Sequence, residues 1–211
     1  MEWSTFWNSV GAVGSILVAI MAIWGEWVRS IFVGPKLKLI PHNFRGTITT
    51  LTEIDRKTLE PIRSYKAIYY HLRVDNSRRW VTAKNCRVLL RQLHRRGPDG
   101  EFHIIPLVVP LQFVWSPAEW APTLQTVADN EILDLGAITE LSGKFEPKCY
   151  VTSANFQGFV GPNEAVRYSL SIVADNYVSP KVQVFEVAWN GKWSENLDDM
   201  EKYVTIKEVF K

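Results

Sequence analysis

Cysteine is scarce in this chain, and the marks of a secreted protein are missing. Only two of its 211 residues are cysteines, Cys86 and Cys149, so a scaffold stapled by several disulfides is excluded. Two unpaired thiols in a reducing compartment are favoured, and a single disulfide between them remains the alternative. No Asn-x-Ser/Thr acceptor occurs, which fits a domain that is not secreted.

The short motifs that mark most enzymes are absent as well. The sequence contains no G-x-S-x-G, Walker-type glycine loop, H-E-x-x-H or C-x-x-C. His94 and His103 are expected to face each other across a hairpin closed by the turn at Gly97–Gly100, but a third metal ligand is lacking. We therefore predict no catalytic residue, no metal site and no cofactor.

Charge is missing from one long N-terminal run, Phe6–Trp24. Its length matches an α-helix that crosses a hydrocarbon core of about 30 Å. The run begins with Phe6; Trp3 and Trp7 lie at this end and Trp24 and Trp27 at the other, as in the aromatic belts of a membrane span. The pattern predicts an N-terminal transmembrane α-helix with a juxtamembrane extension over residues 1–33.

The flanking charges predict an orientation for this segment. No Lys or Arg precedes the run, whereas Arg29, Lys36, Lys38 and Arg45 follow it. By the positive-inside tendency, a single-pass protein of the cell inner membrane would have its N-terminus outside and its C-terminal domain in the cytoplasm. A cleaved signal peptide is disfavoured because the first residues carry no positive charge.

Small and polar residues recur along one stripe of this predicted helix. They are Asn8, Gly11, Ser15 and Ala19. Such residues allow close approach of helices in lipid and can hydrogen-bond between them. The stripe predicts a homo-oligomer or a larger membrane complex, with a chance arrangement of common residues as the alternative.

From residue 36 onward the pattern is that of β-strands. Ile68, Tyr70, Leu72 and Val74 alternate with more polar residues, which is typical of a half-buried strand. Similar short runs continue to the C-terminus, separated by turn residues about every ten positions. Residues 36–211 are therefore predicted to form one antiparallel β-sandwich, immunoglobulin-like in strand count only, with a β-barrel as the alternative.

One window of this β-domain is strongly basic. Between Arg73 and Arg96 the only acid is Asp75. A regular strand would place Arg87, Arg91 and Arg95 in one outward line, with Arg73 on a neighbouring strand. Four interpretations stay open: a solvated sheet face, contact with anionic inner-leaflet lipid, a nucleotide or nucleic-acid ligand, and an acidic protein partner.

The run Phe6–Trp24 followed by an all-β domain resembles small bacterial membrane proteins with a cytosolic β-sandwich or β-barrel domain. Some of those proteins are antiphage-defence effectors. The resemblance implies an architecture and transfers no site residue. We expect a membrane-anchored, non-catalytic binding and assembly module. The alternatives are a ligand-triggered effector that oligomerises in the membrane and a membrane-tethered enzyme.

Overall fold

A computed structural model describes residues 34–55, 57–118 and 121–209, together with residues 3, 10, 13–16, 18–20, 22, 24 and 25. In this described part of the chain, no helix is both long and apolar enough to cross a membrane. This finding overturns the transmembrane helix in the predicted fold class and the predicted single-pass localisation at the inner membrane.

The residues singled out in the N-terminal run divide into two groups. Ser15, Ala19 and Trp24 are helical and exposed. The others lie outside the described residues, so the structure neither places them nor tests the contact stripe; they are Phe6, Trp7, Asn8, Gly11 and Trp27.

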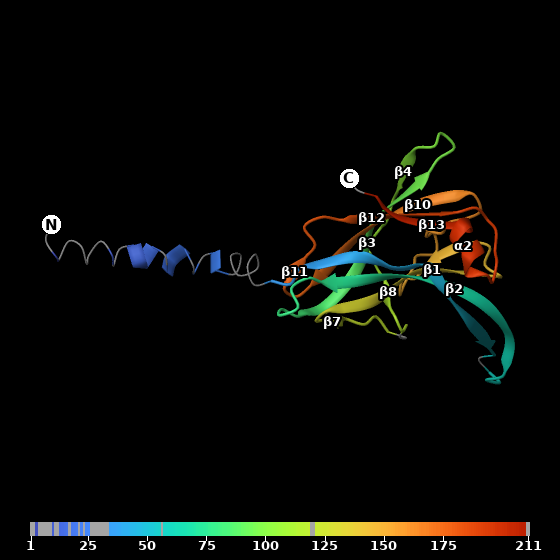
Figure 1. The fold of residues 1–211 in the computed structure, drawn as a ribbon, viewed down its shortest axis with the longest axis horizontal. Helices are drawn as coiled ribbons and strands as arrows, with labels where there is room; N and C mark the ends of the chain where they lie inside the picture. The colour runs from blue at the N-terminus through green and yellow to red at the C-terminus, as the bar shows by residue number, and fades with distance from the viewer. Residues whose placement is uncertain are drawn as a thin grey trace.

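Thirteen strands and one short helix make up the rest of the described chain (Figure 1). The long strands are β1 (Leu37–Ile54), β2 (Pro61–Asn76), β3 (Ala83–Arg96), β8 (Asn130–Thr139) and β10 (Glu164–Ala174). The shorter ones are β4 (Phe102–Ile105), β5 (Leu111–Gln112), β6 (Val114–Trp115), β7 (Gln125–Val127), β9 (Phe145–Pro147), β11 (Tyr177–Val178), β12 (Gln183–Trp189) and β13 (Val204–Val209). The helix is α2 (Leu197–Tyr203).

These strands form two sheets in which every recorded strand pair is antiparallel. One sheet has the order β1-β2-β8-β6, with β9 paired to β8. The other has the order β13-β12-β10-β3-β4, with β11 paired to β10 and both β5 and β7 paired to β3. The sandwich-like arrangement of antiparallel sheets agrees with the expected β architecture.

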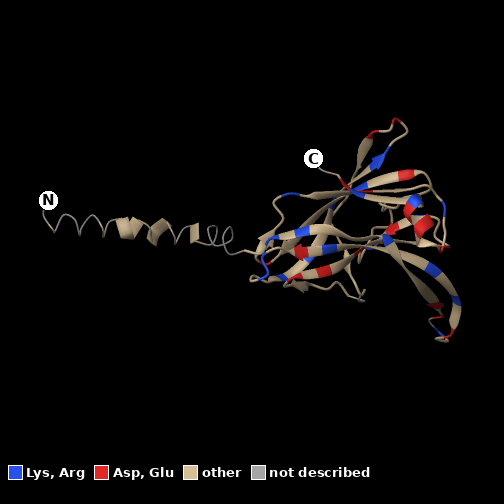
Figure 2. Ribbon diagram, in the orientation of Figure 1, with Lys and Arg blue, Asp and Glu red and all other residues tan. Residues whose placement is uncertain are grey.

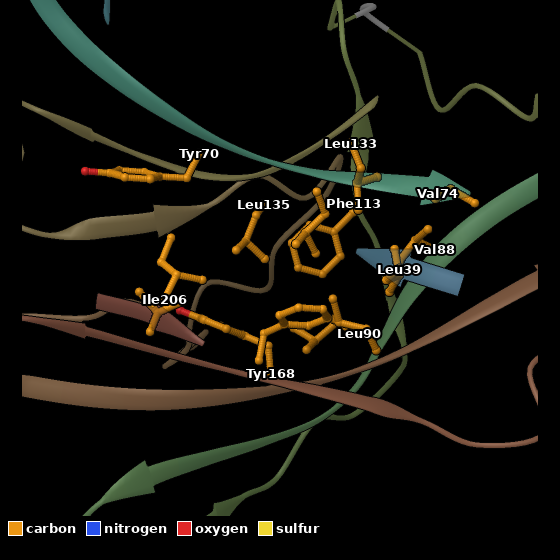
Figure 3. Close-up of a cluster of buried hydrophobic side chains, with 14 of the residues drawn as sticks. Leu39, Tyr70, Val74, Val88, Leu90, Phe113, Leu133, Leu135, Tyr168 and Ile206 are labelled. Atoms are coloured by element: carbon orange, nitrogen blue, oxygen red, sulfur yellow. The ribbon is translucent and has the colours of Figure 1, made fainter. Parts of the chain in front are cut away.

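The two sheets share one hydrophobic core (Figure 3). Phe145 of β9 lies between Tyr70 of the first sheet and Tyr168 of the second, with ring centroids 5.9 and 6.4 Å away. All three side chains are fully buried. Aromatic rings at this spacing add to the free energy gained from burying their surface, so these residues join the sheets.

The alternation predicted for β2 is confirmed. Ile68, Tyr70, Leu72 and Val74 point into the core and are fully buried. The residues between them remain partly accessible on the outer face of the first sheet, as the two-residue period of a strand requires.

The Asn190–Gly191 pair in the sequence predicts a tight hairpin, but the structure has a longer connection there. The chain leaves β12 there, passes through α2 and only then returns as β13, where Val204 pairs with Trp189. The side chain of Asn196 caps the helix by accepting a hydrogen bond from the Asp198 amide. In the sequence, Asn196 followed by the acidic Asp198 and Asp199 is a typical helix N-terminus.

Candidate functional site: the hairpin arm and the sheet face at its root

The two longest strands continue beyond the sandwich as a hairpin. The last pair between β2 and β8 joins Ala67 to Thr139, whereas β1 and β2 remain paired out to Ile54 and Pro61. We call residues Thr50–Lys66 the arm; in Figure 1 it curves away from the body at the lower right. The polar, Thr-rich sequence of Arg45–Arg63 allowed either a hairpin or a loose loop, and the structure shows a hairpin.

The arm places its apolar side chains in solvent. None of its described side chains is buried against the body, and Ile54, Leu59 and Ile62 are 52%, 77% and 59% exposed. A hairpin with only two strands is marginally stable in water because neither face is covered. The arm is therefore a projecting element whose apolar residues are available for contact.

Side-chain contacts between its two strands hold the arm together. The guanidinium of Arg63 donates to the carboxylate of Glu53 at 2.6 Å and lies 5.8 Å from the centre of the Tyr65 ring. On the other face, the hydroxyls of Thr52 and Ser64 are 3.0 Å apart. Such cross-strand pairs each contribute about 0.2–1 kcal/mol. They favour this register of the hairpin, but they leave both of its faces exposed.

A tight network fixes the tip of the arm. The carboxylate of Asp55 accepts hydrogen bonds from the amides of Lys57 at 2.7 Å and Thr58 at 3.2 Å. The Asp55 carbonyl accepts from the Leu59 amide at 2.8 Å. The hydrogen bond from the Lys57 amide, and next that from Thr58, lower the pKa of Asp55 below its usual range.

This network holds Leu59 in a conformation that leucine rarely adopts. Its φ is 59°, in the left-handed region that costs an L-residue about 1–2 kcal/mol. The same residue is the most exposed apolar side chain of the arm. A left-handed residue is common at the end of a hairpin loop, but glycine or asparagine is usual there, so a leucine at this position is strained and exposed at the same time.

The arm leaves the body at a bend in β1. Between Asn43 and Thr47 three residues of β1 span a single residue of β2, and the third of them is Gly46, with φ +85°. A Cβ at Gly46 would lie 2.4 Å from a methyl carbon of Ile68, which is fully buried. Only glycine satisfies both requirements at this bend.

A polar cluster lies on the outer face of the first sheet near this bend. The imidazole Nδ1 of His71 is 2.9 Å from a carboxylate oxygen of Asp134, and both side chains are nearly buried. The Tyr69 ring lies almost parallel to the His71 ring at 6.4 Å, and the His42 ring is 6.5 Å away. Irregular pairing beside His42 and opposite His71 indicates bulges, which re-aim side chains near functional sites.

Neither the Tyr69 hydroxyl on this face nor the two cysteine thiols, which lie at the core of the domain, is an activated nucleophile. Burial, and after it the charge of Asp134, raises the pKa of Tyr69. Burial also raises the pKa of both thiols, Cys86 and Cys149, to about 12, so neither is a thiolate at neutral pH. The His71–Asp134 contact links β2 to β8 on the outer face of the first sheet.

The four arginines singled out in the sequence are not brought together. Arg73 lies on β2 in the first sheet, whereas the others lie on β3 in the second. Pairing of β3 with β10 shifts by one residue between Leu90 and Gln92, so Arg91 is the extra residue and the expected outward line is interrupted. Lys and Arg are interleaved with Asp and Glu over both sheets and the arm (Figure 2).

Arg95 and Arg91 already have partners within the domain. Arg95 forms an ion pair with Glu164 and donates to the carbonyls of Gln157 at 2.6 Å and Phe159 at 3.0 Å. Arg91 donates to the hydroxyl of Ser171 at 2.8 Å. An anion would have to compete with these bonds, so the geometry does not favour an arginine-lined anion site.

The two histidines expected to face each other are one residue out of register. His94 pairs with Ile104, and His103 pairs with Arg95. Instead of a histidine partner, His103 contacts the carboxylate of Asp99 at 2.8 Å. The described residues contain no group of three His, Cys, Asp or Glu side chains that could hold a metal ion.

No protein-family model, curated protein or solved structure matches the chain. The resemblance to bacterial membrane proteins with a β-domain therefore stays a prediction.

The arm tip could not be predicted as a site from the sequence, because its apolar residues do not follow the two-residue period of a strand. The spacing of Asp55 and Thr58 is nevertheless typical of a turn.

Proposed function

We propose that the chain is a non-catalytic binding and assembly module that engages its partner through the arm. The observation that carries this proposal is the arm tip, where the Asp55 network presents Leu59 in a strained conformation with its side chain in solvent. The polar cluster of His71 and Asp134 lies on the sheet from which the arm projects.

The energetics support a docking role for this tip. Burying a leucine side chain stabilises a complex by about 1.5–3 kcal/mol, and an anchor that is already ordered loses little conformational entropy on binding. The Asp55 hydrogen bonds fix the Leu59 backbone before any partner arrives. Ile54 and Ile62 flank it and enlarge the apolar surface that a partner could cover.

Site-specific photo-crosslinking in cells tests this function. A photoreactive amino acid placed at position 59 of the full chain is expected to give discrete covalent adducts with a partner protein. The matched control places it at Val108, a loop residue that is 87% exposed and lies outside the arm.

Adducts at position 59 that disappear when Asp55 is changed to Ala would support docking through an ordered tip. The proposal is overturned if position 59 gives no adduct, or if its adducts are the same as those obtained at position 108. Far-ultraviolet circular dichroism of each variant checks that the sheets remain folded.

A further inference from the structure

The arm offers two strand edges, and only one is open to pairing with another strand. On its β2 side the arm begins with Pro61, which lacks an N–H, and carries the charges of Arg63 and Lys66. On its β1 side lies Thr47–Thr52, a run without charge or proline, which we call the edge segment. Proline and charge protect natural edge strands from pairing, so the edge segment is the unprotected side.

Where β1 crosses the two-sheet body, side chains of the second sheet occupy the backbone groups of its outer edge. There the side-chain amide of Gln183 accepts from the backbone amide of Leu39 at 2.7 Å and donates to its carbonyl at 2.8 Å. Tyr177 donates to the carbonyl of Leu37 at 3.0 Å. In the described chain, the edge segment has β2 as its only paired strand and β1 ends the sheet.

We propose that the partner of the arm is a second copy of this chain, joined by antiparallel pairing of the two edge segments. This inference rests on the proposed binding function and names its partner. Two-fold pairing centred on Thr50 places Thr49 opposite Leu51 and Ile48 opposite Thr52. Within the edge segments no like charges then face each other, and the β-branched Ile48 and Thr52 are paired. The Lys66 ammonium, which donates to the Thr50 hydroxyl at 3.1 Å in the single chain, has to turn away from the two-fold centre.

The charges next to the edge segment fit the same arrangement. Arg45, which forms an ion pair with Asp198 of α2, lies before it. Glu53, which is paired with Arg63, and Asp55 follow it. Antiparallel pairing brings the basic end of one copy toward the acidic end of the other. The product is a four-stranded sheet in the order β2-β1-β1-β2, in which the edge segment is no longer an open edge.

Disulfide trapping of the full chain tests this pairing directly. Thr50→Cys puts an exposed thiol at the two-fold centre, where directly opposed residues are about 4.5–5.5 Å apart between Cα atoms, within disulfide range. Background reaction is low because burial raises the pKa of Cys86 and Cys149 to about 12. Mild oxidation is expected to convert most of the protein to a covalent dimer.

The matched control is Ser64→Cys, an exposed residue on the β2 side of the arm, which should remain monomeric. Thr49→Cys covers a register shifted by one residue. A disulfide dimer at position 50 or 49 but not at 64 supports the inference, and so does loss of the dimer when Thr52→Lys is added to the trapping variant.

The inference is overturned if neither edge variant dimerises, or if the control dimerises equally. Photo-crosslinks from position 59 to a different protein, together with a monomeric Thr50→Cys variant, would leave the binding function standing and remove the second copy as its partner. Absence of both signals would remove both proposals.

Discussion

At the scale of single residues, the arm tip combines an unfavourable backbone with a favourable hydrogen-bond network. Leu59 has φ 59°, and Asp55 accepts two amide hydrogen bonds that hold the turn closed around it. Asparagine tolerates the left-handed region because its short polar side chain bonds locally. The strain at Leu59 can therefore be removed without changing the network.

Leu59→Asn is expected to stabilise the tip while it removes the apolar anchor. Relief of about 1 kcal/mol of backbone strain should slow hydrogen exchange of the tip amides several-fold. The matched control is Ile62→Asn, the same polar change at an exposed strand position, which should speed exchange because asparagine is a poor strand former. Faster exchange in Leu59→Asn than in the natural chain would contradict the account.

The Asp55 carboxylate makes the tip sensitive to acid. Its pKa is lowered in the folded chain, so its contribution is complete above its ordinary pKa of about 4 and is lost as the pH falls through the lowered value. Amide chemical shifts of Lys57 and Thr58, followed by NMR, should titrate together in that acidic window. In Asp55→Asn, which retains an acceptor oxygen without a charge, the same titration should vanish.

At the scale of elements, the structure explains which sequence patterns could be interpreted. β2 was predictable because Tyr70 and Leu72 lie in the core while their neighbours face outward. The arm has no buried face, so its sequence shows no alternation and could not be told from a loop. The expected arginine line failed because a bulge at Arg91 changes the facing of the residues beyond it.

The bend at the root of the arm depends on Gly46. Gly46→Ala should lower the free energy of unfolding by about 2–4 kcal/mol, because a Cβ meets Ile68 and alanine disfavours a positive φ. Gly100 provides the control, since its φ is +83° and a Cβ there meets nothing within 4 Å. Gly100→Ala should cost only about 1 kcal/mol in urea denaturation. Equal losses at both positions would contradict a steric role for Gly46.

At the scale of the whole molecule, one core joins the two sheets and leaves the arm outside it. Phe145 contacts Tyr70 and Tyr168 across the layers, whereas the described side chains of the arm contribute no buried residue. A substitution in the arm is therefore expected to change its contacts with a partner without lowering the free energy of unfolding of the two-sheet body. The expected membrane span, which was predicted from length, polarity and flanking tryptophans, finds no counterpart in the described residues.

Phe145→Ala is expected to destabilise the entire domain by about 3–5 kcal/mol, since it removes a buried ring between the sheets. Thermal unfolding followed by circular dichroism would measure the loss. Val108→Ala, at a loop residue that is 87% exposed, should change the stability by no more than about 0.5 kcal/mol. A loss below about 1 kcal/mol for Phe145→Ala would show that the sheets do not depend on this contact.

The most direct test of the arm is amide hydrogen exchange of the full chain, measured when it is free and when it is bound in the complex it forms. We predict that amides of Thr47–Leu59 exchange markedly more slowly in the complex, while those of the exposed loop around Val108 are unchanged. Unchanged exchange along the arm, with protection appearing elsewhere on the sandwich, would contradict the claim that the arm is the binding element.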